Sequence, residues 1–307
     1  MFSRITRAEY DAIKALNASG AKHLLPPHGS PAVFAHRRAN PEPDKAAWAF
    51  GRYFHALELE PEEVALRFGN LPPKPSLSHL RKKDGSPYAN PAASVQGKAL
   101  LAEWDDACDL HRALNPGMVM LSPDDSALGV QMLGVLRANR AWQDLHDGDP
   151  AVHNEWSLTW TDEATGVACK GQCDRVFIPW DGAPTIVDLK TDGGADFGGG
   201  DVQWEAIRWG WHRQAAFYVD GLAANGHPGA RFVWAVISKA APHEVAIYEA
   251  GEDLLDAGRA EMRLACELYR DCAAAGVWPT AQETGLVPRV IGVPKGYRAP
   301  QIFGGGQ

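Results

Sequence analysis

Two strand-like runs that carry acidic residues constrain the fold of this chain more than any other feature. The first run covers residues 167–178, the second covers residues 185–191, and a turn-rich segment joins them. Side chains alternate across a strand, so Asp188 and Lys190 share one face of the second run while Leu189 takes the other. If the runs pair as a hairpin, Asp174 of the first comes beside Asp188. The pattern therefore predicts two carboxylates and a lysine on neighbouring strands of one sheet.

This combination of side chains suits metal-dependent cleavage of a phosphodiester. Carboxylates hold a hard cation such as Mg²⁺, and a lysine at the rim can orient or deprotonate the attacking water. A D-x-K triplet alone is a weak signal, but here Ile186 and Val187 lead into it, which places Asp188 at the end of an apolar strand. A buried carboxylate is costly unless it is paired or bound to a metal. A surface ion pair between Asp188 and Lys190 is the alternative explanation.

Helical patterns before and after these strands define the fold class. We expect helices at 7–18, 44–60 (with Asp44 as N-cap), 94–114, 123–139, 203–222 and 253–275. We expect further strands at 155–160, 231–238 and 244–248, and loops rich in proline or glycine at 26–43, 70–95 and 193–200. This order of elements is typical of an α/β or α+β domain, in which helices flank a central mixed sheet.

The chain divides into three predicted parts. An N-terminal helix and loop occupy residues 1–43, the main domain occupies 44–286, and a flexible tail rich in proline and glycine occupies 287–307. Hydrophobic residues make up 45% and charged residues 22% of the chain, as in an ordinary soluble globular protein. The sequence has no apolar run of about 18 residues and begins without an apolar leader, so we expect neither membrane association nor secretion. The five cysteines lack the spacing of a disulfide framework, which suits the cytoplasm.

The net charge of −8 argues against general affinity for nucleic acid, because phosphate contacts need lysine and arginine. Acidic side chains can still collect a metal, and basic residues can line a local channel. The candidates for DNA contacts are Arg52, Lys170, Arg208 and Arg213, together with the basic pairs and triplets at 37–38 and 81–83. A solvated basic patch explains any one of them equally well.

Four further residues are candidates for the same site. His55 lies one turn after Gly51, which permits close approach of a strand or metal to this helix, although a helical histidine is more often an ordinary core or surface residue. Gln214 and Tyr218 are one helical turn apart and face the same way, as ordinary packing would also produce. Glu155 on the preceding strand can reach the site, but a strand glutamate that faces solvent is the ordinary expectation.

The sequence also bears on other cofactors. Cys169 and Cys173 with Cys266 and Cys272 could hold an iron–sulfur cluster, but without a compact C-x₂-C pair we favour small buried hydrophobes. A P-loop pattern is absent from the sequence, so we expect no ATP dependence. A nucleophile elbow G-x-S-x-G is also absent, which argues against Ser-His-Asp hydrolysis.

The order of these motifs resembles the PD-(D/E)xK nuclease superfamily. The G-x-x-x-H-x-x-x-L-E-P block at 51–61 comes first, followed by Asp174, then Asp188-Leu189-Lys190, and finally Gln214-x-x-x-Tyr218. Within the superfamily the chain is similar to the nuclease domain of RecE, exonuclease VIII, over residues 44–279. The resemblance implies a restriction-endonuclease-like core.

The resemblance also implies a function. An enzyme of this kind is an ATP-independent, Mg²⁺-dependent exonuclease (Mn²⁺ is the alternative metal) that degrades the 5′ strand of linear duplex DNA. It leaves a 3′ single strand for an annealing protein, and it can form a closed homo-oligomeric ring around DNA. Two other functions stay open on the same fold. They are a Cas4-like single-strand nuclease with bound iron, and a non-catalytic module that binds DNA ends.

Roles follow residue by residue from the resemblance. Asp174, Asp188 and His55 would serve at the metal, and Lys190 would position or activate water. Gln214 and Tyr218 would contact the terminal or scissile nucleotide and brace the site.

Overall fold

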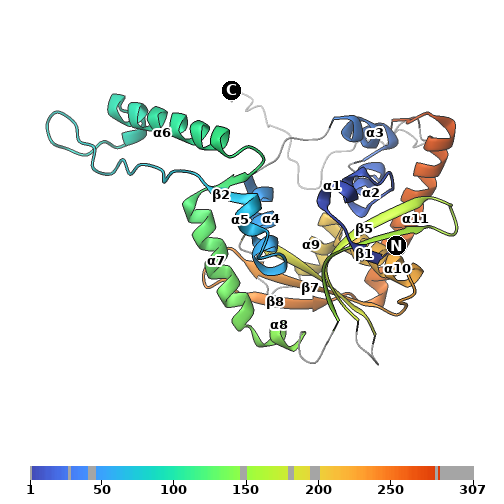
Figure 1. Cartoon of the computed structure of the whole chain (residues 1–307). Helices are drawn as coiled ribbons and strands as arrows, with labels where there is room; N and C mark the ends of the chain where they lie inside the picture. Colours follow the sequence, from blue (N-terminus) through green and yellow to red (C-terminus); the bar gives the residue numbers. More distant parts are fainter. Residues whose placement is uncertain are drawn as a thin grey trace, which may run out of the picture.

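A six-stranded mixed sheet forms the centre of the molecule (Figure 1). The computed structural model describes residues 2–26, 29–40, 46–145, 151–178, 183–193, 201–280 and 283. In sheet order the strands are β1 (Phe2–Arg4), β4 (Val152–Thr161), β5 (Ala168–Phe177), β6 (Thr185–Asp192), β7 (Arg231–Ser238) and β8 (Val245–Glu249). Strands β6 and β7 are parallel and all other neighbours are antiparallel, so the predicted mixed sheet is confirmed.

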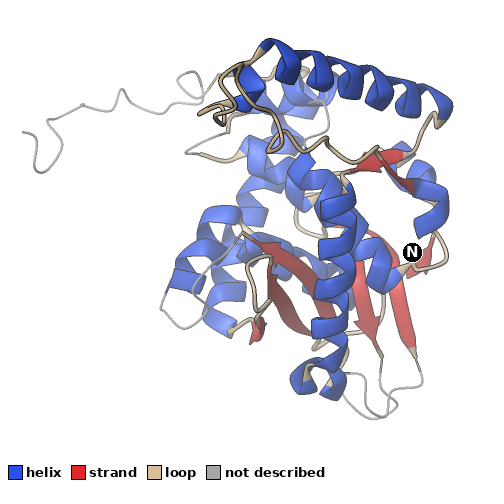
Figure 2. Ribbon diagram, turned by 90° about the vertical axis from the view of Figure 1, so that its left-hand side faces the viewer, coloured by secondary structure: helices blue, strands red, loops and turns tan. Residues whose placement is uncertain are grey.

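Helices cover both faces of the sheet, which gives three layers (Figure 2). One face carries α2 (Ala18–Leu24), α10 (Trp211–Ala224) and α11 (Glu252–Ala275), and the other carries α4 (Ala46–Leu59), α7 (Pro123–Ala138) and α8 (Arg140–Asp144). Strand β6 shows the alternation that the sequence predicts, since Ile186 packs in the first apolar cluster while Val187 and Leu189 pack in the second. Because both faces are buried, the strand is apolar except where the site begins.

The predicted hairpin between the two acidic strands is confirmed. Strand β5 pairs antiparallel with β6, and the last paired position joins Arg175 to Val187. One step further along the same register, Asp174 lies opposite Asp188. The hairpin thus brings the two carboxylates to the place where the strands separate.

The N-terminal region is more helical than we expect from its sequence. Helix α1 (Arg7–Ala12) stops early and α2 starts after Asn17, whose side chain accepts from the Gly20 amide, so one continuous helix over 7–18 is wrong. Helix α3 (Pro31–Ala39) occupies the predicted loop 26–43. Its signal is the Ser30 side chain, which caps the first turn ahead of the proline. Strand β1 pairs with β4, so this region adds an edge to the sheet.

The predicted helix 203–222 is two helices, α9 (Asp201–Trp209) and α10. Gly210 separates them with a φ of 77°, a left-handed conformation that glycine adopts without steric cost. This break turns the chain so that Trp209 and Trp211 both face one cavity, described below.

Residues 68–121 form an arm that stands away from the sheet (Figures 1 and 2). A two-stranded parallel sheet of β2 (Phe68–Asn70) and β3 (Val119–Leu121) makes its base, next to α5 (Val64–Arg67). The predicted loop 70–95 is confirmed apart from a short 3-10 helix, Pro91–Ala93, and it leads into α6 (Val95–Leu114). Strands of three residues are too short to show alternation, which is why the sequence does not reveal them.

Three sequence predictions fall outside the described residues: the Asp44 N-cap, most of the glycine-rich loop 193–200, and the tail 287–307. Within the described part of the chain, none of the helices combines the length and apolar character needed to cross a membrane.

Candidate active site

Asp174 lies at the centre of the candidate site, where β5 and β6 separate. Its Oδ2 atom accepts a hydrogen bond from the Leu189 amide at 2.7 Å, so the side chain bridges the two strands just past their last paired position. The same oxygen lies 3.5 Å from His55 Nδ1. Helix α4 delivers this histidine because Phe50 and Phe54 of the same helix are buried against the sheet.

Glu155 completes a group of three potential metal ligands. One ligand atom each from His55, Glu155 and Asp174 lie within 4.8 Å of one another. Glu155 has a φ of 50°, which is uncommon for a residue with a side chain. The ladder between β4 and β5 pairs the residues on either side of it but skips the Glu155–Asp174 position. The expectation of a solvent-facing Glu155 is therefore wrong, since the residue is half-buried in the site.

The electrostatics of the group favour a bound cation. Burial, reinforced by the nearby charges of Asp174 and Glu60, raises the pKa of Glu155 to about 8. The carboxyl group therefore holds a proton at neutral pH while no cation is present. A bound divalent ion would favour the ionised carboxylate instead, because metal ligands bind in their deprotonated form.

Asp188, Lys190 and Gln214 form a second, adjoining group. The Asp188 Oδ1 atom accepts from Gln214 Nε2 at 2.6 Å, and Lys190 Nζ lies 2.6 Å from Oδ2. Lys190 also donates to Gln214 Oε1 at 3.2 Å. Asp188 is only 2% exposed, and this burial raises its pKa while the charge of Lys190 opposes the shift. The amide of Gln214 thus fixes both charged groups.

The side chains present fit a divalent cation. Two half-buried carboxylates and an imidazole converge, and the buried Asp188 Oδ2 atom beside them, although ion-paired to Lys190, has no hydrogen-bond partner among the described residues. Oxygen-rich sets suit Mg²⁺ or Mn²⁺, and the imidazole is better accepted by Mn²⁺. The structure groups Asp174 and His55 with Glu155, whereas the ligand set expected from the resemblance has Asp188 in place of the glutamate.

Tyr218 is a core residue in this structure. It is 9% exposed, and its ring lies so close to Gly171 of β5 that a Cβ atom there would come within 2.7 Å of it. Tyr218 therefore packs against β5, the strand that carries Asp174. It lies in the apolar core between the sheet and α10 and does not face solvent.

The four predicted DNA contacts differ in their surroundings. Arg213 pairs with Glu261 at 2.5 Å, and the buried Lys170 donates to the Tyr10 carbonyl at 2.7 Å. Both of these side chains have structural partners. Arg52 on α4 and Arg208 on α9 are more exposed, and Arg208 pairs with Glu205 at 3.4 Å.

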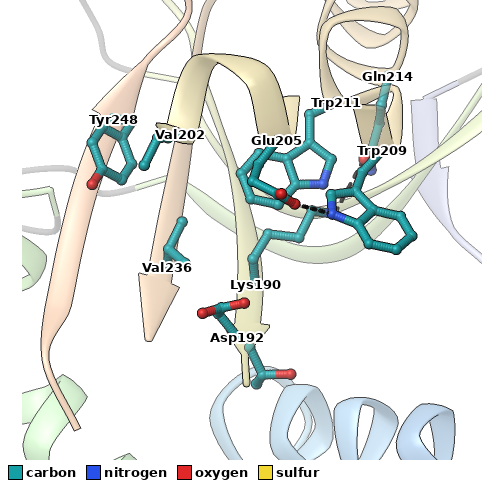
Figure 3. Close-up of a pocket in the computed structure, with 10 residues that line it drawn as sticks. Lys190, Asp192, Val202, Glu205, Trp209, Trp211, Gln214, Val236 and Tyr248 are labelled. Atoms are coloured by element: carbon teal, nitrogen blue, oxygen red, sulfur yellow. Dashed lines mark hydrogen bonds between the residues drawn. The ribbon is translucent and has the colours of Figure 1, made fainter. Parts of the chain in front are cut away.

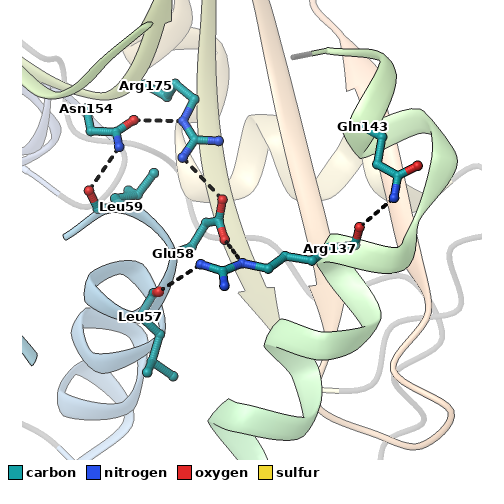
Figure 4. A network of polar contacts seen from close by, with 7 residues as sticks. All are labelled: Leu57, Glu58, Leu59, Arg137, Gln143, Asn154 and Arg175. Atoms are coloured by element: carbon teal, nitrogen blue, oxygen red, sulfur yellow. Dashed lines mark hydrogen bonds and ion pairs between the residues drawn. The ribbon is translucent and has the colours of Figure 1, made fainter. Parts of the chain in front are cut away.

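A buried polar network connects α4 to the strands of the site (Figure 4). Glu58 accepts from Arg137 Nε at 2.8 Å and from Arg175 Nη2 at 3.2 Å. Arg175 Nε in turn donates to Asn154 Oδ1 at 2.7 Å. Glu58 follows His55 by three residues and Arg175 directly follows Asp174, so the network fixes the histidine against the aspartate. The sequence gives no signal for it, because nothing local shows that Glu58 is buried.

The cysteines do not assemble into a cluster site. All five are free and buried, and the thiols of Cys169 and Cys266 contact each other. Among the described residues, which include every cysteine, His55, Glu155 and Asp174 form the one group that could hold a metal. The iron–sulfur hypothesis therefore lacks a set of ligands.

Fold and site together define a PD-(D/E)xK-type α/β domain, with two acids and a lysine at a strand fork. The chain belongs to the family described as PDDEXK-like domain of unknown function (DUF3799), whose model matches residues 27–285. This match confirms the superfamily that the motif order suggests.

Comparison with solved structures supports the same fold. A crystal structure from Eubacterium rectale, described as "Putative exonuclease", has a TM-score of 0.53 at 14% identity and covers 95% of this chain and 96% of that one. At this identity the likeness shows the fold alone. A second structure, SSO0001, is 14% identical over 46% of this chain and 61% of that one, and its TM-score of 0.26 carries no argument. A comparison with curated proteins finds no match.

Proposed function

We propose that this protein is a metal-dependent, ATP-independent exodeoxyribonuclease that degrades the 5′ strand of linear duplex DNA. One observation carries the proposal: the ligand atoms of His55, Glu155 and Asp174 converge within 4.8 Å, directly beside the Asp188–Lys190 pair. The PDDEXK-like family supports a nuclease in the wider sense. The order of motifs, which resembles RecE, supports the exonuclease in particular.

Each residue of the site has a role in the proposed reaction. Glu155, Asp174 and His55 would hold Mg²⁺ or Mn²⁺, with Asp188 beside them. The bound ion would polarise a phosphate oxygen and lower the pKa of the attacking water. Lys190 can donate to that water or to the phosphate, because Asp188 and Gln214 fix its ammonium group at the rim. Gln214 also holds the Asp188 carboxylate in place through Oδ1.

The proposed partners follow from this activity. The substrate is an end of duplex DNA, and the exposed Arg52 and Arg208 would contact its phosphates. A 3′ single strand would remain for an annealing protein. A closed homo-oligomer around the duplex would keep the enzyme on its substrate between cuts.

The test uses linear duplex DNA labelled at the 5′ or the 3′ end, with Mg²⁺ and without ATP. We expect rapid loss of the 5′ label, and a loss of activity on the order of 100-fold or more in Asp188→Asn and Asp188→Ala. Asp220→Asn on α10 is the matched control, because that carboxylate is 49% exposed and pairs with Arg259. Full activity of Asp188→Ala would refute the assignment of the site.

Other outcomes of this experiment select the alternatives. Earlier release of the 3′ label would reverse the polarity. Cleavage confined to single strands would favour a single-strand nuclease. Binding of DNA ends without metal-dependent release of nucleotides would favour a non-catalytic module.

A further inference from the structure

A cavity of about 420 Å³ opens directly beside Lys190 (Figure 3). It lies between strands β6, β7 and β8 on one side and the junction of α9 with α10 on the other. Its volume falls within the range of about 300–1,000 Å³ that is usual for small-ligand sites. The residues that give it chemical character are Lys190, Asp192, Glu205, Trp209, Trp211 and Tyr248.

Two tryptophans line the cavity, one held by packing and the other exposed to solvent. Trp211 is fixed, because its ring packs 6.0 Å from that of the buried Trp234. Trp209 is 52% exposed at the mouth. Residues two apart on a continuous α-helix point about 200° away from each other, so an unbroken helix would separate these rings. The left-handed Gly210 between them brings both to one cavity.

The outer tryptophan is flanked by cations. Lys22 Nζ lies 5.6 Å from the Trp209 ring centre, and Arg208 Cζ lies 5.2 Å from it. The Arg208 side chain is 70% exposed and pairs with Glu205 at 3.4 Å, a solvent-exposed pair that a ligand phosphate can replace. Aromatic rings with neighbouring positive charges are what single-stranded nucleic acid requires, since bases stack on the rings and phosphates meet the cations.

The lining of the cavity also carries negative charge. Asp192 and Glu205 line it, and Glu205 accepts a hydrogen bond from the Trp209 indole N–H. Carboxylates repel a phosphate, but they accept hydrogen bonds from the amino and ring N–H groups of nucleobases. The charges therefore favour a phosphate at Lys190 and a base beside the carboxylates.

We propose that this cavity receives the unpaired base of the nucleotide whose phosphate is cleaved at Lys190. The inference rests on the proposed nuclease function and assigns substrate-contacting roles to Trp209 and Trp211. A base that is still stacked in a duplex cannot enter, so the terminal nucleotide must first separate from its partner, and this separation is easiest for a mismatched pair. The cavity therefore makes the enzyme favour frayed or mismatched ends.

The test pairs a change in the protein with a change in the DNA. Cleavage of duplexes with ordinary ends is compared with cleavage of duplexes that carry abasic residues at both the 5′ and 3′ termini. Trp209→Ala is expected to slow cleavage of ordinary ends by about 10- to 100-fold, and of abasic ends by less than about 2-fold. Trp209→Phe should restore most of the rate. Trp204→Ala is the matched control, because Trp204 is on the same helix, is 73% exposed and does not line the cavity.

An equal effect of Trp209→Ala on both substrates, or on neither, would overturn the inference while the nuclease proposal stands. If neither the wild type nor any variant cleaves either DNA, the nuclease proposal fails. A binding measurement then tests whether the cavity receives a base. A single strand that ends in 2-aminopurine should then lose fluorescence with the wild type and Trp204→Ala, but not with Trp209→Ala. No fluorescence change with the wild type would refute a base-binding cavity. Circular dichroism of each variant establishes that it is folded.

Discussion

Glu58→Gln is expected to destabilise the protein strongly, because it removes the counter-charge of a buried guanidinium. The side chains of Glu58 and Arg175 are each 6% exposed, and they contact each other at 3.2 Å. Arg175 could not move to solvent without disrupting β5. The substitution thus leaves a positive charge in the interior with weaker compensation.

The magnitude follows from the contacts that remain. Loss of one partner of a buried ion pair costs about 3–5 kcal/mol. Arg175 would keep its hydrogen bond to Asn154 at 2.7 Å and its position 5.2 Å from the Trp142 ring centre, which partly compensate its charge. We therefore expect a loss near the lower limit, about 3 kcal/mol of unfolding free energy.

The assay is urea unfolding at pH 7, followed by far-UV circular dichroism. Glu249→Gln is the matched control, since Glu249 also pairs with an arginine, Arg231, but both side chains are about half exposed, at 48% and 52%. Such a surface pair contributes about 1 kcal/mol or less. In the double variant Glu58→Gln/Arg175→Met the unpaired charge is gone. The double variant should therefore lose less unfolding free energy than the two single variants lose in sum.

A loss in Glu58→Gln no larger than in Glu249→Gln would contradict the reasoning. Strict additivity in the double variant would contradict it as well, because the cost would then not come from the unpaired Arg175. We also expect weaker Mg²⁺ binding by Glu58→Gln, since α4 holds His55 through this network.

Two further predictions concern the site and its support. Glu155 has a pKa of about 8 in the folded protein, against an ordinary value of 4.5 in the unfolded chain. Between these two values the unfolded chain has lost the proton and the folded protein has kept it. The contribution of Glu155 to the free energy of unfolding therefore becomes steadily less favourable from pH 4.5 to 8 and then levels off. Calorimetric Mg²⁺ affinity should accordingly weaken by up to about tenfold per pH unit below 8 in the wild type, and a Glu155→Gln variant with the same pH slope would refute this. Gly171→Ala should cost about 1–3 kcal/mol in urea unfolding, because its Cβ atom would lie 2.7 Å from the Tyr218 ring. Gly134→Ala, in open space on α7, should instead be stabilising, and equal effects of the two would exclude this steric account.

The sequence determined the features that depend on local spacing. Alternation along β6 assigns Asp188 and Lys190 to one face and Leu189 to the other, and the structure agrees. The turn between the runs predicts the antiparallel pairing of β5 with β6. The helices expected at 94–114 and 123–139 are α6 and α7, and in the structure a serine side chain caps the first turn of each. Each of these signals acts within a few residues, so the chain displays it without its tertiary context.

Only the tertiary structure decided which elements meet. Glu155 joins the metal group because β4 departs from regular pairing at that residue, and His55 joins it because α4 packs its phenylalanines on the sheet. The burial of Glu58 arises in the same way, because α4 packs against Arg175 of β5. Local spacing fixes the side of an element from which a residue projects. Which side chain it contacts on that side depends on packing between segments a hundred or more positions apart. No local sequence pattern contains this information.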